Sequence, residues 1–312
     1  MQAVRRDCAK KLEEHNGMMR LSDIGTIRAL LARHGFHFSK ALGQNFLVNP
    51  TVCPRMAEAS GAADGVGVLE IGPGIGVLTV ELAQRASKVV AVELDSRLLP
   101  VLAETLADYP NASVIHGDVM QLDLRQIIET EFAGLREVVV CANLPYYITS
   151  PVIMKLLEER LPVTRITVMV QKEAADRICA APGTRAAGAL SLGVSYYTTP
   201  EVLFRVNRGS FMPAPNVDSA VIRLNVHPPE VTPQSPERMF AAIRAAFGQR
   251  RKTLPNALAA AGWRKPEIAD AMARAGIAPG ARAEELTLAQ FAALSDALPE
   301  RNAAKEDEQN AE

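Results

Sequence analysis

The residues best suited to chemistry lie in the segment Asn143-Leu144-Pro145-Tyr146, which follows the apolar run EVVVCA. The side-chain carbonyl of Asn143 and the backbone carbonyl of Leu144 can accept the two hydrogens of a planar amine. Such contacts orient the nitrogen lone pair and stabilise the positive charge that develops as the nitrogen is alkylated. Pro145 stiffens the turn, and Tyr146 offers a ring on which a flipped base can stack. The segment predicts methylation of an exocyclic adenine amine; taken alone, it is also compatible with an ordinary Asn/Pro turn.

A glycine loop upstream indicates where a cofactor would bind. The segment VLEIGPGIGVLT at 68–79 predicts a strand, a loop and a helix, with Gly72, Gly74 and Gly76 spaced as G-x-G-x-G. Glycines let the backbone turn tightly and approach a ligand beside the free N–H groups of a helix N-terminus. A dinucleotide fingerprint requires G-x-G-x-x-G, and position 77 is valine. The spacing therefore disfavours a dinucleotide.

Acidic residues mark the ends of three successive predicted strands. Glu70 stands just before the glycine loop, Glu93 ends the next strand, and Asp118 follows the third. A carboxylate at the Glu93 position can hold a ribose diol, and one at Asp118 can accept a hydrogen bond from an adenine amine. These carboxylates would repel a pyrophosphate and attract a cation. The pattern predicts S-adenosylmethionine rather than NAD, although each acid taken alone is compatible with a solvated strand end.

The elements that must position these residues alternate between β-rich and helical segments, which predicts a doubly wound α/β sheet. Two helices are predicted before the sheet, over 23–35 and 51–60. Further helices are predicted over 76–86, 96–107, 121–132, 150–160 and 172–180. The predicted strands are Val66–Ile71, Lys88–Leu94, Ser113–His116, Glu137–Ala142, Arg165–Val170, Leu192–Tyr197 and Ala220–Val226.

Composition changes along the chain predict four regions. Residues 1–20 are polar and charged and suggest a flexible leader, and 21–228 hold the predicted cofactor-binding catalytic domain. A Pro-rich linker leads into 237–299, which is Ala-rich with helical periodicity and predicts a small α-helical domain. The acidic tail, 300–312, is expected to be disordered.

Global composition excludes several classes of protein. The 312 residues carry a net charge of −1, with 48% hydrophobic and 22% charged residues, so the chain is neither disordered nor uniformly basic. It has no apolar run of the ~18 residues that a membrane helix needs, and no secretory signal. The four cysteines form no CxxC and the five histidines form no HExxH. We expect a cytoplasmic protein with reduced thiols, no metal and no membrane contact.

A local basic stretch interrupts this near-neutral balance. Residues 205–252 contain eight basic and three acidic residues, whereas the tail from Glu300 contains two basic and five acidic ones. Arg250, Arg251 and Lys252 are consecutive, and Arg244 precedes them. An RRK triplet is often a solvated helix face, but after a base-binding loop it favours contact with RNA phosphates. Pro255 predicts that a helix breaks here and a new one begins.

Seven motifs in this order resemble those of the ribosomal RNA adenine dimethyltransferases, and within that family most closely the enzymes of the bacterial small subunit. The resemblance covers about residues 23–298. Its motifs are GQNFL (43–47), EIGPGIGVLT (70–79), VELD (92–95), GDV (117–119), NLPYYITSP (143–151), VQKEAADRI (170–178) and FMPAPNVDSAV (211–221).

The resemblance implies a class I, Rossmann-like methyltransferase sheet and several residue roles. Catalysis is assigned to Asn143, Leu144, Tyr146 and Phe211, with Phe211 clamping the target base opposite Tyr146. Asp218 and Ser219 are expected to position this loop rather than to react. S-adenosylmethionine contacts are assigned to Asn45, Leu47, Gly72, Gly74, Glu93, Asp118 and Asn143.

The resemblance also implies a substrate. Members of the family add two methyl groups to each of two adjacent adenosines in a hairpin loop near the 3′ end of small-subunit (16S) rRNA. They act on a partly assembled 30S subunit and contribute to its late assembly. We expect this chain to do so as a monomer, with RNA phosphates held by Arg244, Arg250, Arg251 and Lys252.

Three alternatives stay open at this point. One is the related large-subunit (23S) rRNA methyltransferase of the macrolide-resistance type, which shares a QNFL-type motif and N-x-P-Y. Another is a non-catalytic assembly or transcription factor on the same scaffold, and the third is a DNA adenine methyltransferase. The wording of NLPYYITSP and FMPAPNVDSAV favours the small-subunit enzyme.

Overall fold

A computed structural model describes residues 21–38, 43–249 and 251–300. The predicted leader 1–20, Arg250 and all of the tail after Glu300 lie outside the described residues. Within these ranges, no helix is long and apolar enough to cross a membrane.

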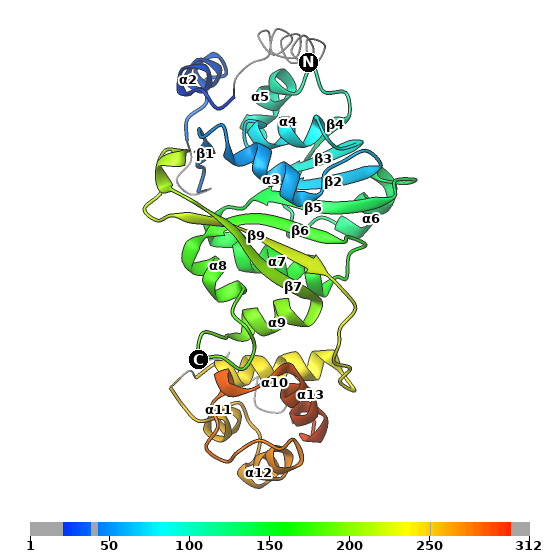
Figure 1. Cartoon of the computed structure of the whole chain (residues 1–312), viewed down its shortest axis with the longest axis vertical. Helices are drawn as coiled ribbons and strands as arrows, with labels where there is room; N and C mark the ends of the chain where they lie inside the picture. The colour runs from blue at the N-terminus through cyan, green and yellow to red at the C-terminus, as the bar shows by residue number, and fades with distance from the viewer. Residues whose placement is uncertain (1–20, 39–42, 250, 301–312) are drawn as a thin grey trace, which may run out of the picture.

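A mixed sheet forms the centre of the molecule, and its order in the described residues is β4-β3-β2-β5-β6-β9-β7 (Figure 1). The first five strands in this order are parallel, whereas β9 runs antiparallel to both of its neighbours. This is the predicted Rossmann-like α/β fold. The strands are β2 (Val66–Ile71), β3 (Lys88–Glu93), β4 (Ala112–His116), β5 (Glu137–Asn143), β6 (Arg165–Gln171), β7 (Thr198–Val206) and β9 (Ser219–Val226).

Helices cover both faces of the sheet, which explains why its central strands are apolar on both sides. Side chains of α3 and α4 pack with Val68 and Cys141 on one face, and those of α6, α7 and α9 pack with Leu69 and Val140 on the other. α2 packs against α5 at the β4 end of the molecule. The helices are α2 (Ile24–Arg33), α3 (Val52–Ser60), α4 (Val77–Ala83), α5 (Leu99–Thr105), α6 (Leu124–Glu131), α7 (Thr149–Glu158), α8 (Lys172–Ile178) and α9 (Ala189–Tyr197).

The C-terminal part is helical, as predicted, and lies at the opposite end of the molecule from α2 (Figure 1). It packs onto α9: the Phe240 ring stacks on Tyr197 at 5.9 Å between centroids and meets the edge of Tyr196 at 5.3 Å. One apolar cluster therefore continues from the sheet into these helices. The division at 228 and 237 stays a prediction. The helices are α10 (Pro236–Phe247), α11 (Leu254–Ala260), α12 (Lys265–Arg274) and α13 (Leu288–Ala297).

The prediction of a strand over Leu192–Tyr197 is wrong, because these residues form the end of helix α9. Leu192, Val194, Tyr196 and Tyr197 are all buried, and a short apolar run buried on every side has no period that separates helix from strand. The strand that the sheet uses is β7, which begins at the next residue. Pro200 obscured it, since proline is tolerated only at a sheet edge, where β7 lies.

The break near Pro255 is confirmed. α10 ends at Phe247, and α11 begins at Leu254 with Pro255 in its first turn. Arg251 and Lys252 therefore lie in the turn between two helices and not on a continuous helical face.

Candidate active site

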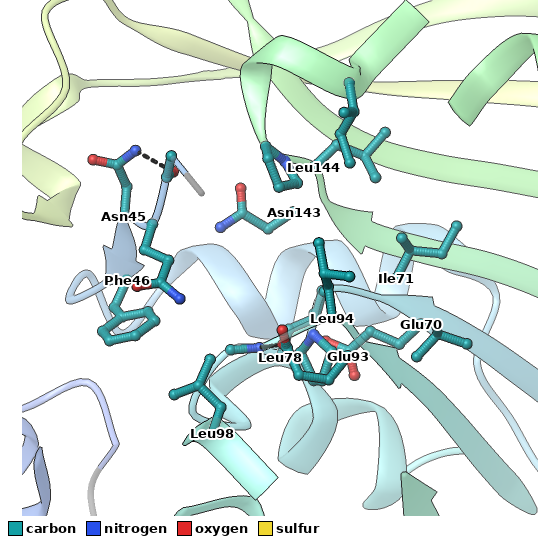
Figure 2. Close-up of a pocket in the computed structure, with 18 of the residues that line it drawn as sticks. Asn45, Phe46, Glu70, Ile71, Leu78, Glu93, Leu94, Leu98, Asn143 and Leu144 are labelled. Atoms are coloured by element: carbon teal, nitrogen blue, oxygen red, sulfur yellow. Dashed lines mark hydrogen bonds between the residues drawn. The ribbon is translucent and has the colours of Figure 1, made fainter. Parts of the chain in front are cut away.

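A pocket opens at the carboxyl ends of the parallel strands, where β2 and β5 lie side by side and the strand order reverses (Figure 2). Ligands in open α/β sheets bind at this switch point. The pocket collects ten residues that the sequence assigned to cofactor binding or catalysis: Asn45, Leu47, Gly72, Gly74, Glu93, Asp118, Asn143, Leu144, Tyr146 and Phe211.

The glycine loop between β2 and α4 forms one wall. Gly72, Gly74 and Gly76 have φ of 70°, 61° and 90°, which L side chains rarely adopt. A Cβ on Gly72 would meet nothing within 4 Å, so the backbone there faces open space. A Cβ on Gly74 would lie 3.2 Å from the Phe46 ring. The loop thus presents bare backbone to the pocket.

Glu93 links this loop to the end of β3. One carboxylate oxygen accepts a hydrogen bond from the Gly74 N–H at 3.2 Å, and the other accepts one from the Asp95 N–H at 2.8 Å. The side chain is buried, which raises its pKa, while the amide donors oppose that rise. Glu93 therefore stands fixed at the floor of the pocket. Asp118, at the end of the following strand, accepts from the Met120 N–H at 2.9 Å.

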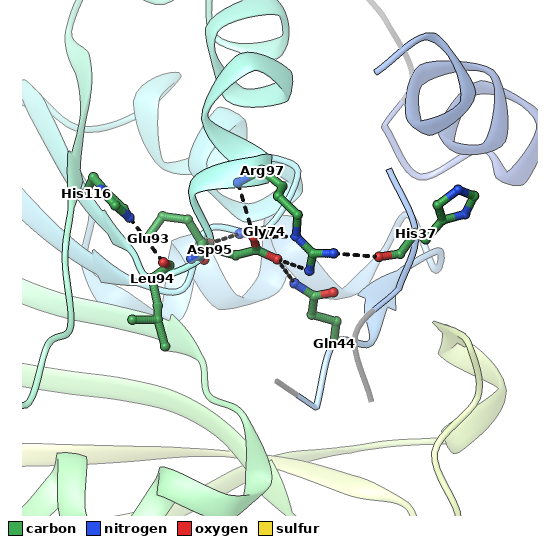
Figure 3. A network of polar contacts seen from close by, with 8 residues as sticks. All are labelled: His37, Gln44, Gly74, Glu93, Leu94, Asp95, Arg97 and His116. Carbon is green, nitrogen blue, oxygen red and sulfur yellow. Dashed lines mark hydrogen bonds and ion pairs between the residues drawn. The ribbon is translucent and has the colours of Figure 1, made fainter. Parts of the chain in front are cut away.

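A second polar network, which the sequence did not predict, holds the chain just before β1 (Phe46–Leu47) (Figure 3). Asp95 forms a two-point ion pair with Arg97 and accepts from the Gln44 amide at 2.8 Å. The bond to Arg97 is the largest cause that lowers the pKa of Asp95. Arg97 in turn donates to the His37 carbonyl. Through Gln44, the network fixes the chain next to Asn45.

Two strands of two residues each bring distant motifs together. β1 (Phe46–Leu47) pairs antiparallel with β8 (Phe211–Met212), so that Leu47 lies opposite Phe211. The Val48 N–H adds a 2.8 Å bond to the Ser210 carbonyl. Leu47 and Phe211 are both buried. The pairing places the QNFL and FMPAP motifs on the same side of the pocket.

The Asn143–Tyr146 turn closes the opposite wall. β5 ends at Asn143, and the Leu144 N–H donates to the Met169 carbonyl at 3.2 Å. Tyr146 begins the 3₁₀ turn Tyr146–Ile148, and its hydroxyl is 2.7 Å from Ser219 Oγ. Partial burial raises the pKa of Tyr146, which keeps it a neutral phenol.

The loop that ends at Ser219 is itself held in place. Asp218 accepts from the Arg208 N–H at 2.9 Å. The positioning role predicted for Asp218 and Ser219 is therefore consistent with their contacts: one fixes its own loop and the other fixes the ring of Tyr146.

Glu70 is the unusual group of the site. It lines the pocket at 1% exposure, and its Oε2 has no hydrogen-bond partner in the described structure. Burial raises its pKa to about 8, so the carboxyl is largely protonated at neutral pH in the absence of a ligand. Cys141 is also fully buried, and burial raises the pKa of its thiol far above neutrality, so it acts as a core residue and not as a nucleophile.

The charge of the pocket has one sign. Its acidic lining residues are Glu70, Glu93 and Asp118, of which Glu70 is largely protonated without a ligand, and no lysine, arginine or histidine among the described residues lines it. Within the described ranges, no group of three or more His, Cys, Asp or Glu side chains is placed to hold a metal ion. The arrangement suits an organic cation without phosphates.

The predicted RNA-contacting residues lie elsewhere. Arg244 is exposed on α10, and Arg251 and Lys252 are exposed in the following turn. None of the three lines the pocket, and among the described residues none forms a salt bridge. They stand at the helical end of the molecule, so nearness in the sequence to the FMPAP loop does not place them at the pocket.

Sequence reasoning missed Gln44, Phe46, Asp95 and Tyr147, all near predicted residues. Gln44 and Phe46 flank Asn45, and Tyr147 follows Tyr146; all three line the pocket. Asp95 completes the VELD motif and anchors Gln44. Their positions beside assigned residues were the only signal in the sequence. The contact between Gln44 and Asp95 joins segments that are remote in the sequence, so no local pattern indicates it.

Comparison with known proteins identifies the family to which this chain is similar. Residues 35–300 match the model of the family described as ribosomal RNA adenine dimethylase. The chain is 51% identical over 280 residues to the ribosomal RNA small subunit methyltransferase A of Geobacillus thermodenitrificans, covering 88% of this chain and 95% of that protein. It is 49% identical over 276 residues to the protein of the same name from Anoxybacillus flavithermus, covering 87% and 94%.

Two solved structures share the fold. A dimethyladenosine transferase from Plasmodium falciparum is 26% identical, with a TM-score of 0.62 over 80% of this chain and 95% of that one. The 23S rRNA methyltransferase ErmE is 27% identical, with a TM-score of 0.61 over 81% and 99%. On this evidence, the chain belongs to the ribosomal RNA adenine dimethylase family of S-adenosylmethionine-dependent methyltransferases.

Proposed function

We propose that this methyltransferase dimethylates the N6 amines of two adjacent adenosines in the 3′-terminal hairpin loop of small-subunit (16S) rRNA. Its substrate would be a partly assembled 30S subunit in the cytoplasm, and the enzyme would act as a monomer with a role in late assembly. The observation that carries the proposal is that the Asn143–Tyr146 turn and the glycine loop line one pocket. The names of the small-subunit relatives support the choice of particle.

The residues of the turn can prepare an adenine amine for alkylation. Oδ1 of Asn143 and the carbonyl of Leu144 accept the two amine hydrogens, which directs the nitrogen lone pair into the pocket. The same two oxygens stabilise the positive charge that develops on nitrogen. Tyr146, fixed by Ser219, and Phe211, fixed by the β1–β8 pairing, would hold the flipped base between them. The surplus proton would leave to solvent.

The pocket fits S-adenosylmethionine, which supplies an electrophilic methyl group on a sulfonium cation. Three acidic residues and bare glycine backbone match a cationic, phosphate-free nucleoside better than a dinucleotide. Glu93 and Asp118 would hold the nucleoside, and Asn45, Leu47, Gly72, Gly74 and Asn143 would complete its contacts.

The predicted phosphate contacts would act at a distance from the pocket. Arg244, Arg251 and Lys252 are exposed cations at the helical end, while Arg250 lies outside the described residues. Contacts there would orient a large particle without reading its sequence. This favours a structured ribosomal substrate, which can span both regions, over a short single strand.

The large-subunit enzyme is the alternative with a specific observation behind it, since ErmE shares the fold at 27% identity. The small-subunit relatives are far more similar, at 51% and 49% identity. A non-catalytic factor is disfavoured because every predicted catalytic residue lines the pocket. A DNA adenine methyltransferase is the weakest alternative, because the QNFL and FMPAP motifs point to the rRNA enzymes.

The first experiment supplies the enzyme with isotopically labelled S-adenosylmethionine and unmethylated 30S-type or 50S-type particles. We expect label in small-subunit rRNA, with primer extension stopping at two adjacent adenosines near its 3′ end. Label confined to large-subunit RNA would refute the proposed substrate and favour the macrolide-resistance type.

The second prediction concerns the proposed amine acceptor. Asn143→Ala removes Oδ1 and should lower methyl transfer by a factor of at least about 100, comparable to the loss of one oxyanion-hole donor. Particle binding should persist, because the exposed cations of the helical end are untouched. Turnover equal to that of the unmodified enzyme would rule out this role for Asn143.

The third prediction concerns phosphate contact. The double variant Arg251→Gln/Lys252→Gln should bind particles more weakly and reduce the slope of log affinity against log salt by roughly 1.5 to 2. Arg274→Gln is the matched control, since this exposed arginine of the same helical region is already paired with Asp270 at 2.7 Å. If both variants show the slope of the unmodified protein, phosphate contact by this turn is excluded.

The fourth prediction follows from the raised pKa of Glu70. Between its unfolded value near 4.3 and its folded value of about 8, the folded state keeps a proton that the unfolded chain releases. The free energy of unfolding should therefore fall as pH rises through this window, by up to about 1.4 kcal/mol per pH unit, and level off above it. Glu70→Gln should flatten this part of the curve.

Urea titrations from pH 5 to 9 without cofactor would measure the effect. Glu173→Gln, at an exposed position of α8, should leave the curve unchanged. S-adenosylmethionine should stabilise the unmodified protein more at high pH, where Glu70 is ionised, and that pH dependence should disappear in the Glu70→Gln variant. Equal slopes of unfolding free energy against pH for the unmodified protein and both variants would contradict the raised pKa of Glu70.

A further inference from the structure

The side chain of Tyr147 combines high exposure with a place in the lining of the pocket. It is the most exposed large hydrophobic residue in the described structure, at 55%, and it also lines the active-site pocket. Of the other exposed large hydrophobic residues in the described ranges, only Leu94 also lines this pocket. Exposure together with a place in the lining puts the Tyr147 ring where a ligand that enters the pocket would pass.

The backbone directs the side chains of Tyr146 and Tyr147 to different sides. Tyr146 to Ile148 form a 3₁₀ turn, in which successive side chains project about 120° apart. Tyr146 is directed inward and reaches Ser219, whereas Tyr147 is directed outward. The outer ring is therefore not part of the inner clamp formed by Tyr146 and Phe211, although it is attached to the same turn.

The outer ring lies close to the backbone at Gly43. A Cβ on Gly43 would lie 3.5 and 3.6 Å from Cδ1 and Cε1 of Tyr147, and 3.9 Å from Cβ of Pro145. Gly43 has φ of +60°, so a side chain there would be strained, although its Cβ would only make ordinary contact with the ring. Gly43 therefore lies beside the Tyr147 ring, at a position whose backbone favours glycine.

Resting on the proposed function, we infer that Tyr147 is a stacking platform for the nucleobase next to the target adenine. The two target adenosines are adjacent, so when one base occupies the pocket its neighbour must lie at the rim. Tyr147 lies there, one residue from the inner clamp. A neutral exposed ring suits a base and not a phosphate, and base–aromatic stacking is worth a factor of roughly 5 to 150 in affinity.

The test is a double-mutant cycle in which the Tyr147 ring and the neighbouring base are removed separately and together. Small-subunit particles are assembled with a synthetic 3′ rRNA segment that carries either both adenosines or one adenosine next to an abasic site. With intact RNA, Tyr147→Leu should raise KM roughly 5- to 150-fold with kcat little changed, and Tyr147→Phe should restore KM. With the abasic RNA, Tyr147→Leu should have no further effect, because the stacking partner is already absent.

Two controls separate this proposal from other outcomes. Val202→Ala, an exposed apolar position on β7 outside the pocket, should leave KM unchanged on both RNAs. The affinity for S-adenosylmethionine and the melting temperature of Tyr147→Leu should match those of the unmodified enzyme.

The platform is overturned if Tyr147→Leu has an unchanged KM, if its loss is the same on both RNAs, or if it loses cofactor binding. An unmodified enzyme that fails to methylate the intact particle would instead refute the proposed function itself, which the first experiment detects independently.

Discussion

The pairing of β1 with β8 is the contact on which the pocket depends. It joins residues more than 160 positions apart through a two-residue ladder, and so short a ladder is marginal without side-chain burial. The burial is present: Phe46, Leu47 and Phe211 are all inside, and Phe46 contacts the neighbouring aromatic Phe36. The hydrophobic contacts offset the cost of ordering two loops and leave both motifs facing the same space.

The same segment links the wall to the floor. Phe46 approaches Gly74 so closely that this position of the glycine loop has no room for a side chain without a shift of the ring. Gln44, two residues earlier, is bonded to Asp95 beyond the end of β3. Loop, strand end and β1 segment therefore support one another, and a substitution at Gly74 would disturb the wall as well as the backbone that faces the ligand.

Sequence patterns predicted those parts of the site that lie within continuous motifs. The glycine loop, the acids at strand ends and the Asn143–Tyr146 turn each follow a recognisable strand, and parallel strands bring their carboxyl ends to one edge. The β1–β8 pairing and the Asp95–Gln44 bond were not predictable in this way, because each joins segments whose local patterns carry no trace of their partner. The error at Leu192–Tyr197 has a related cause, since burial by α10 and α7 decided its conformation.

Charge connects the two ends of the molecule. The net charge of −1 conceals a pocket whose charged residues, among those described, are all acidic and a helical end with exposed arginine and lysine side chains. An acidic pocket attracts a cationic cofactor but repels the phosphates of the RNA whose base must enter it. The docking contacts that we propose therefore lie outside the pocket: phosphate contacts at the helical end and the neutral ring of Tyr147 at the rim. On this reasoning, only an RNA that reaches both regions brings its adenine to Asn143, and a particle of defined shape meets that condition where free polyanions do not.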